Sequence, residues 1–507
     1  MDTLAVITSR ASLGLEAPLV TIEVHLGGGL PAFTLVGLPE ASVRESRERV
    51  RSALLTCGFE FPAARITVNL APADLPKEGG RFDLAIAVGI LLASEQIIAP
   101  EIKSLELLGE LALSGEIRHI PGAISAVKTA TTAHHTVVLP PEDAPLAARV
   151  EHSNVIAPHS LGELVAWLAG QQSLAPVTAT PLPAASLWQG GDFSEVIGQS
   201  GAKRAMLLAA AGGHNLLMLG PPGTGKTMLA SRLPGILPPL TPEQAIDVAS
   251  IYSLSEQHRS AEQWQVAPFR CPHHSASSVA LVGGGSKPRP GEISLAHHGV
   301  LFLDELAEFP RQVLDALRQP LESGEVHIAR ASQQVCFPAK FQLIGALNPS
   351  PTGYYQGHQA RSNVDQILHY LNRLSGPFLD RFDISIEVTT LPPGTLSHPP
   401  AEQTSEQLHQ QVMAARTRQL ERQGCTNSDL TGQQLRQFTP LSITDQDFLE
   451  QAITRLGLSI RAYHRIWKVA ATIADLAQQP LAHPHLIEAL GYRAMDRLLS
   501  QLTQAVY

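Results

Sequence analysis

Cysteine is scarce in this sequence. No two cysteines are close enough to form a Cys-x-x-Cys pair, and the four are Cys57, Cys271, Cys336 and Cys425. Isolated cysteines are typical of a chain that stays reduced in the cytoplasm, and they argue against a zinc site built from cysteine. We therefore expect a cytoplasmic protein.

Long apolar runs and an excess of positive charge are also missing. No stretch approaches the roughly 18 apolar residues that cross a membrane, and the N-terminus lacks a basic segment followed by an apolar one. We expect no membrane span and no signal peptide. Lysine and arginine total 37 against 46 acidic residues, which gives a net charge of −9. Any contact with nucleic acid must therefore come from local cationic patches.

What is present is enough sequence for about three globular domains, since the 507 residues are 44% hydrophobic. Residues 1–168 alternate short β-rich runs with helical stretches. Residues 169–191 are rich in Pro, Ala, Ser, Thr and Gln, which predicts a linker. Residues 192–395 alternate strand and helix patterns again, and this predicts a parallel sheet with helices on both faces. Residues 396–507 show helical periodicity.

A complete phosphate-binding loop, GxxxxGK[ST], follows the apolar run 216–219 and precedes a helix-like stretch. Its backbone N–H groups can cradle phosphate oxygens, Lys226 would reach the β- and γ-phosphates, and the Thr227 hydroxyl would bind Mg²⁺. The alternative is a Gly/Pro turn with a buried lysine stem. The sequence predicts a site for ATP and Mg²⁺ at Gly220, Pro221, Pro222, Gly223, Thr224, Gly225, Lys226 and Thr227.

Two further apolar runs end in polar side chains. The first opens onto Asp304, which would hold Mg²⁺, and Glu305, which would position and deprotonate the attacking water. The second ends at Asn348, whose amide could orient the water or contact the γ-phosphate. Each feature alone is common at the end of a surface strand or in a turn. Behind a phosphate-binding loop, their order predicts a nucleotide-hydrolysing site.

Arg381 precedes another apolar run, 384–388. A planar and permanently charged fork of donors suits the γ-phosphate held by a neighbouring subunit. The alternative is an ion pair within the chain, with Asp380 or Asp383.

These four elements, in this order, resemble an AAA+ ATPase. The wording FRCPHHSASSVALVGGGSKPRPGEISLAHHGVLFLDELAEF at 269–309 is more specific, and it resembles the magnesium-chelatase-like AAA+ proteins and, within them, the ComM/YifB family. The resemblance covers essentially the whole chain. It implies an α/β P-loop core with a parallel sheet and a C-terminal helical lid, preceded by an α+β domain. It also implies a ring of identical subunits, expected to be a hexamer.

Cationic residues occur on two segments that we expect to project from the core. Residues 281–291 predict a loop inserted in a helix, with Lys287 and Arg289, and residues 325–340 predict a β-hairpin that includes Arg330. Cationic projecting loops suit phosphate tracking along DNA. A solvated loop or a salt bridge between subunits is almost equally compatible with these residues.

In the C-terminal block, Ser459 is expected to cap a helix that carries two arginines. By the resemblance, Arg461 is the lid arginine that touches the γ-phosphate. Arg465 lies one turn later on the same face and is the second choice. The alternative is that both are solvated helix cations.

Residues 1–168 resemble the ribosomal-S5-like fold of Lon protease domains, most closely at 109–117 and 76–79. Arg81 and Ile124 occupy the positions where that family has its serine and lysine. Because a Ser–Lys dyad needs a hydroxyl beside an amine, we predict no peptidase activity. The block would instead bind DNA or a partner, or tune ring assembly. A cationic helix face is a candidate surface, although we favour a solvated face paired with acidic neighbours: Arg44, Arg47, Arg49 and Arg51.

Two histidine pairs, 273–274 and 297–298, are weak candidates for zinc ligands. Adjacent side chains on an extended chain point in opposite directions, so each pair offers one ligand per face. Relatives in the family carry cysteines where this chain has Ser350 and Thr352. The resemblance thus implies that their zinc knuckle is absent here, and that Tyr354, Tyr355 and local packing hold the loop.

The function that we predict is an ATP-driven DNA motor. The phosphate loop and its carboxylates predict ATP hydrolysis with Mg²⁺. The resemblance implies branched or single-stranded DNA as the partner and branch migration as the role. The alternative is a chelatase-type motor that remodels a protein partner, although we recognise neither an integrin-like metal-binding domain nor an acidic tail.

Overall fold

The computed structural model describes residues 3–37, 43, 45–179, 188, 190–255, 257, 259–285, 288–330, 333–354, 362–395, 397 and 402–506. The chain divides into two compact units. The first unit comprises Met1–Pro183, Pro242–Ala261 and Ala329–Phe337, and the second comprises Ala184–Thr241, Glu262–Ile328 and Pro338–Tyr507. No helix among these described residues is long and apolar enough to cross a membrane.

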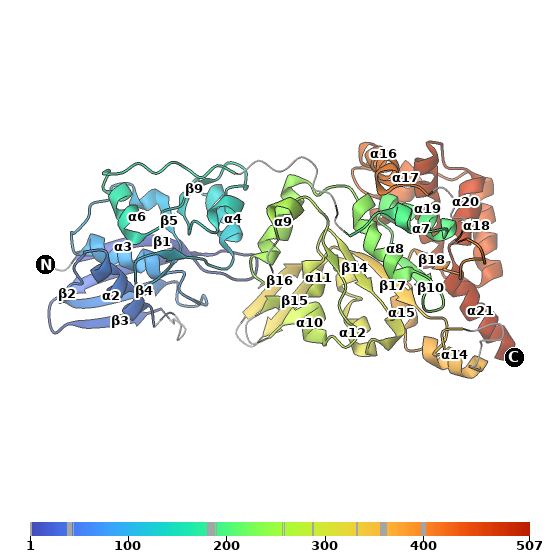
Figure 1. The fold of residues 1–507 in the computed structure, drawn as a ribbon, viewed down its shortest axis with the longest axis horizontal. Helices are drawn as coiled ribbons and strands as arrows, with labels where there is room; N and C mark the ends of the chain where they lie inside the picture. The colour runs from blue at the N-terminus through green and yellow to red at the C-terminus, as the bar shows by residue number, and fades with distance from the viewer. Residues whose placement is uncertain are drawn as a thin grey trace. The chain divides into compact units, whose positions relative to one another are not determined.

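A seven-stranded mixed sheet forms the centre of the first unit (Figure 1), with the strand order β3-β4-β2-β1-β5-β8-β9. Buried and less buried residues alternate along β2 and β4, which gives the sheet one apolar face. The almost wholly apolar helix α3 packs against β1 and β2. The strands are β1 (Thr3–Arg10), β2 (Leu19–Gly27), β3 (Ala32–Val36), β4 (Arg65–Ala71), β5 (Leu105–Leu107), β8 (Thr136–Val138) and β9 (Asn154–Ile156).

Helices and one small ribbon complete the first unit. Helix α9 packs against α4, where Lys128 Nζ lies 2.8 Å from an Asp247 carboxylate oxygen. The elements are α2 (Ser46–Thr56), α3 (Asp83–Ala93), β6 (Glu110–Leu111), β7 (Ile117–Arg118), α4 (Ala123–Thr132), α5 (Ala144–Ala147), α6 (Leu161–Leu168) and α9 (Pro242–Tyr252). The ribbon β6–β7 falls in the segment whose sequence resembles Lon protease domains. The Lon-like fold itself stays a prediction.

A five-stranded parallel sheet forms the centre of the second unit, with the strand order β11-β14-β17-β10-β18. This confirms the parallel sheet that the sequence predicts. Because the strands are parallel, the residues that follow them meet at one edge of the sheet, where α/β proteins bind ligands. The strands are β10 (Leu216–Leu219), β11 (Phe269–Arg270), β14 (Val300–Leu303), β17 (Gln342–Leu347) and β18 (Ile384–Glu387).

Short helices and two ribbons connect these strands. The first ribbon lies between two helices, as expected for the insertion at 281–291. The second is the hairpin predicted at 325–340, of which Ala329–Phe337 is counted with the first unit. The elements are α7 (Ser200–Gly212), α8 (Lys226–Arg232), α10 (Ser278–Val282), β12 (Gly283–Gly284), β13 (Arg289–Pro290), α11 (Glu292–Leu295), α12 (Arg311–Ala316), α13 (Pro320–Ser323), β15 (Glu325–Arg330), β16 (Gln333–Pro338), α14 (Val364–Leu371) and α15 (Gly376–Leu379).

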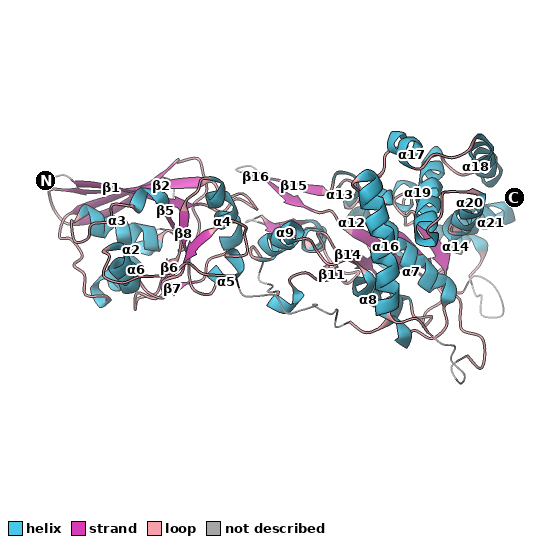
Figure 2. Cartoon of the chain, turned by 90° about the horizontal axis from the view of Figure 1, so that it is seen from above, coloured by secondary structure: helices cyan, strands magenta, loops and turns pink. Residues whose placement is uncertain are grey.

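The C-terminal part of the second unit is helical (Figure 2). Its helices share one core with the parallel sheet, since Trp467 and Phe302 belong to the same buried cluster. The Ser459 hydroxyl accepts a hydrogen bond from Ala462 N, which confirms the predicted helix cap. The helices are α16 (Ser405–Gln423), α17 (Gly432–Phe438), α18 (Ile443–Leu456), α19 (Ile460–Ala477), α20 (His483–Gly491) and α21 (Ala494–Val506).

Candidate active site

The phosphate loop, residues 220–227, connects β10 to α8. Gly223 and Gly225 have φ values of 78° and 87°, a left-handed conformation that glycine adopts without strain. Gly220 passes so close to the Val388 carbonyl that a Cβ atom would not fit there. The glycine positions of the motif therefore have a direct steric reason, and the loop leads its N–H groups into the N-terminus of α8.

Lys226 joins the phosphate loop to Asn348. Its Nζ donates to the carbonyl oxygens of Gly220 at 2.7 Å and Pro221 at 2.8 Å, and to Asn348 Oδ1 at 3.3 Å. Burial lowers the pKa of Lys226, and the carboxylates of Asp304 and Glu305 oppose that effect. Two residues that the sequence assigned to one site, 122 positions apart, thus lie within hydrogen-bonding distance.

Thr227 lies against Asp304. Its hydroxyl donates to Asp304 Oδ2 at 2.6 Å, and the other carboxylate oxygen accepts from Glu305 N at 2.9 Å. Mg²⁺ prefers oxygen ligands, and two ligands at right angles on one ion lie about 3 Å apart. The Thr227 hydroxyl and the Asp304 carboxylate therefore fit their predicted roles as Mg²⁺ ligands. The ion would supply positive charge next to the phosphates.

Glu305 is exposed at the carboxyl edge of the sheet, one residue beyond Asp304. It has φ 50° and ψ 47°, and this left-handed conformation costs a residue with a Cβ atom about 1–3 kcal/mol. Strain of this kind is concentrated at functional sites. His274 Nδ1 lies 3.3 Å from Glu305 Oε2, so the carboxylate has a side-chain partner from another strand end.

His274 is a site residue whose role we did not predict from the sequence, which offered it only as a metal ligand. It follows β11, which pairs in parallel with β14, and Asp304 and Glu305 follow β14. A histidine at the end of a strand next to the acidic strand was the available signal, but the strand order needed to use it is not written in the sequence.

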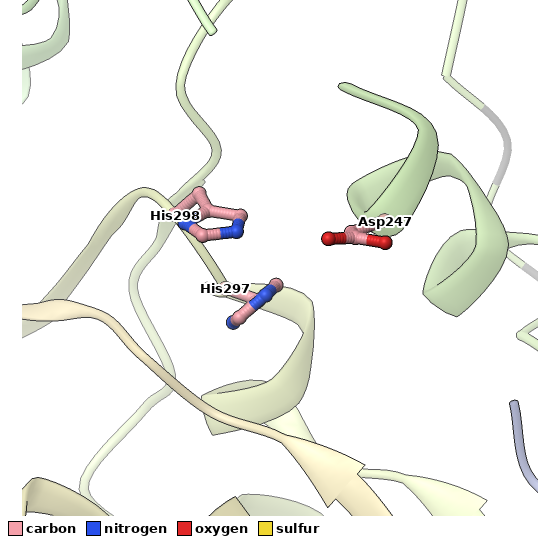
Figure 3. Close-up of side chains that lie close together, drawn as sticks. All are labelled: Asp247, His297 and His298. Atoms are coloured by element: carbon pink, nitrogen blue, oxygen red, sulfur yellow. The ribbon is translucent and has the colours of Figure 1, made fainter. Parts of the chain in front are cut away.

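The two histidine pairs do not have the geometry that we expected. The ring centroids of His273 and His274 lie 4.0 Å apart, and those of His297 and His298 lie 3.8 Å apart. The two rings of each pair therefore lie on the same side of the chain; Figure 3 shows the His297–His298 pair. The expectation of opposite directions is wrong because the chain is not extended there; His298, for example, has φ 57°.

His297 has a structural role in the second unit. Its Nδ1 accepts a hydrogen bond from Lys340 N at 3.0 Å, which ties the end of the β15–β16 hairpin to the turn before β14. Burial, His298 and Lys340 lower the pKa of His297 to about 3. The ring is therefore neutral at physiological pH and serves as an acceptor there.

Arg381 forms an ion pair within the chain, but not with the expected partners. Its guanidinium lies 2.9 Å from a carboxylate oxygen of Glu322, on α13. Asp380 instead pairs with Arg465 at 3.1 Å, and Asp383 accepts from Asn215 N at 3.1 Å. Both neighbouring carboxylates have other partners, and we could not infer Glu322 from the local sequence.

The two lid arginines differ in exposure. The Arg461 side chain is 63% exposed and lies 3.8 Å from Asp380. The Arg465 side chain is 9% exposed and also donates to the Phe382 carbonyl at 3.3 Å. Arg461 has the freedom to reach a phosphate, whereas Arg465 holds the segment around Arg381. The role of Arg461 stays a prediction.

Hydroxyl groups hold the loop at the two positions where the family resemblance led us to look for cysteines. Ser350 Oγ is 3.2 Å from Thr352 Oγ1 and donates to the Tyr354 carbonyl at 2.8 Å. Gly353, with φ 87°, lies directly against Pro222 of the phosphate loop. Local hydrogen bonds thus hold this loop against the nucleotide site; Tyr355 lies outside the described residues.

The expected projecting cations are only partly within the described residues. Arg289 is exposed on β13, Lys287 lies outside the described range, and the Arg330 side chain is not described. Lys340 Nζ lies 3.2 Å from an Asp429 carboxylate oxygen, so it is engaged within the second unit. The role of the insertion and the hairpin in DNA contact stays a prediction.

In the first unit, the dyad positions carry no nucleophile–base pair. Arg81 is buried and donates to the carbonyl oxygens of Arg10 and Pro121, and burial lowers its pKa to about 10. Ile124 is buried in α4. Helix α2 has one arginine fewer available to bind a partner than its sequence suggests, because Arg49 Nε donates to the buried Asp83 at 2.6 Å. Arg44 lies outside the described residues.

Known proteins resemble this chain along its whole length. The family model described as magnesium chelatase, subunit ChlI, matches residues 192–396, the model described as subunit ChlI of Mg-chelatase matches residues 22–143, and the subunit ChlI C-terminal model matches residues 402–493. The three matches cover parts of both units.

Individual relatives show the same pattern. The chain is 54% identical to the competence protein ComM of Haemophilus influenzae, over 99% of both chains. It is 52% identical to the YifB protein of Salmonella typhimurium, also over 99% of both. Identity to the 38 kDa magnesium-chelatase subunit of Cereibacter sphaeroides is 27%, over 39% of this chain and 58% of that subunit. The chain therefore belongs to the ComM/YifB family of magnesium-chelatase-like AAA+ ATPases.

Proposed function

We propose that the protein is a ring-forming motor, expected to be hexameric, that uses ATP hydrolysis to move branched DNA. The observation that carries this proposal is the 54% identity, over 99% of both chains, to a relative named as a competence protein. Competence requires handling of incoming DNA, and branch migration is a step at which a ring motor can act on joined strands. The ring places each ATP at a boundary between two subunits.

The site geometry supports the hydrolytic half of the proposal. Lys226 and Thr227 bind the phosphates and Mg²⁺ together with Asp304, and Glu305 deprotonates the attacking water. These groups already lie in contact within one subunit. Arg381 pairs with Glu322 outside that cluster, and its proposed target is the γ-phosphate of the neighbouring subunit. Hydrolysis would then be coupled between subunits.

A chelatase-type motor is the second candidate, because the matching family models are described as magnesium-chelatase subunits. The magnesium-chelatase subunit itself, however, covers only 39% of this chain. A motor of this kind would use the same ATPase site on a protein partner instead of DNA. The two candidates therefore differ in what stimulates hydrolysis.

Steady-state ATP hydrolysis should be measured with no DNA, single strands, duplex and a four-way junction, each at two salt concentrations. We expect the junction to stimulate hydrolysis most, and the stimulation to fade at the higher salt because phosphate contacts are screened. The Lys226→Ala protein gives the background. Robust hydrolysis that is indifferent to every DNA would contradict the DNA motor and favour a protein-remodelling one.

A further inference from the structure

The Arg381–Glu322 pair is too exposed to matter much for stability. The Glu322 side chain is 65% exposed and the Arg381 side chain 19%, and an ion pair with one partner in solvent contributes little to stability. Arg381 Nε is buried and has no hydrogen-bond partner among the described residues. A desolvated donor without a partner has a cost, which opposes what the ion pair contributes.

Glu322 is close to the base of the β15–β16 hairpin. It belongs to α13, which ends at Ser323, and the Ser323 hydroxyl donates to the Glu325 carbonyl at 3.0 Å and accepts from Glu325 N at 3.2 Å. Gly324, with φ 73°, makes the turn between α13 and β15, and its carbonyl accepts from Ala339 N at 2.7 Å. The hairpin base is therefore joined to Glu322 by two residues of chain and by the Ser323 hydrogen bonds.

The segment that carries Arg381 is fixed on its other sides. Asn215 Nδ2 donates to the Arg381 carbonyl at 2.9 Å, and Arg465 donates to the Phe382 carbonyl at 3.3 Å. Ser375 Oγ, just before α15, donates to an Asp315 carboxylate oxygen on α12 at 2.9 Å. The backbone of Arg381 is thus anchored, and only the guanidinium follows Glu322.

We infer that Glu322 positions Arg381 and couples it to the β15–β16 hairpin, so that DNA at the hairpin sets the rate of hydrolysis in the neighbouring subunit. A shift of the Glu322 carboxylate changes where the guanidinium is presented. An arginine acts on a transferring phosphoryl group only when its donors are placed accurately. This inference rests on the proposed function, since it requires both DNA and a neighbouring subunit.

Mixed rings give a test that separates a positioning role from a structural one. Subunits with Lys226→Ala lose their own nucleotide site but keep Arg381, and subunits with Arg381→Ala keep the site but lose the arginine. In a mixture, hydrolysis requires Arg381 of a Lys226→Ala subunit to act on ATP that is bound to an Arg381→Ala subunit. Light scattering checks that rings form in every mixture.

Glu322→Gln is then placed in one kind of subunit at a time. In the Lys226→Ala subunit, which supplies Arg381, we expect it to lower the junction-stimulated kcat by roughly 2- to 30-fold, the range found for residues that couple two sites. In the Arg381→Ala subunit we expect no change, because the group that Glu322 positions is absent. Glu421→Gln, at an exposed site on α16, is the matched control and should change neither mixture.

Each other outcome has a distinct meaning. Equal losses from both placements show a structural role for Glu322 and overturn the inference, as does the absence of any loss. If the mixture of Lys226→Ala and Arg381→Ala subunits hydrolyses no ATP, Arg381 does not act in trans. If the parent ring ignores the junction, DNA is not the partner. The last result overturns the proposed function as well, whereas the failure of Arg381 to act in trans overturns the inference alone and leaves the DNA motor standing.

Discussion

Replacing Glu305 by glutamine is expected to abolish turnover while ATP binding is kept. Glutamine has nearly the shape of glutamate but cannot take a proton from water, and general-base catalysis typically contributes about 10²–10⁴-fold to the rate. The Lys226, Thr227 and Asp304 contacts do not involve the Glu305 side chain. Steady-state hydrolysis and the binding of a fluorescent ATP analogue measure the two properties separately.

Glu308 gives a matched control for this substitution. It ends the short helical turn that Glu305 begins. Its carboxylate forms an ion pair with Arg373 at 3.3 Å, so its partner is not a residue of the phosphate loop. Glu308→Gln should therefore hydrolyse ATP close to the parent rate. If Glu305→Gln also keeps near-parent turnover, the assignment of Glu305 as the base that activates water is wrong.

Replacing Arg381 by alanine is expected to lower kcat by about 10³-fold or more, the range for an arginine that stabilises the charge of a transferring phosphoryl group. ATP binding should change little, because the hydrogen-bond partners of Lys226 and Thr227 among the described residues do not include Arg381 or Glu322. Arg381→Lys keeps the charge and loses the planar fork of donors, so it should recover only a small part of the rate.

The same variant distinguishes action in trans from action in cis. If Arg381 works on a neighbour, adding Lys226→Ala subunits should restore hydrolysis to Arg381→Ala rings. An Arg381→Ala protein that keeps its full rate would contradict any catalytic role for this arginine. A large loss that Lys226→Ala subunits cannot restore would place the arginine in its own subunit's site.

The strand ends of the nucleotide site could be predicted from the sequence. The apolar runs before Gly220, Asp304 and Asn348 are continuous, as is typical of parallel strands buried on both faces. In a parallel sheet such runs bring their following residues to one edge, whatever their distance along the chain. The motif thus predicts both the elements and their meeting point, and the Lys226–Asn348 and Thr227–Asp304 contacts agree with it.

Contacts between elements of unrelated local pattern could not be predicted. Glu322 lies in a segment with no feature that points to Arg381, and the position of His274 after a strand points to Glu305 only once the strand order is known. Buried charges in the first unit have the same explanation. Arg10 pairs with Glu106 on β5, and nothing in the sequence around Arg10 distinguishes it from a solvated arginine.

The most direct test of the central claim is conversion of a labelled four-way junction into its two duplex products by the purified protein. We predict products that require both ATP and Mg²⁺ and that are absent with Glu305→Gln. Binding of the junction without conversion, under conditions where ATP is hydrolysed, would contradict the claim that this ATPase moves branched DNA.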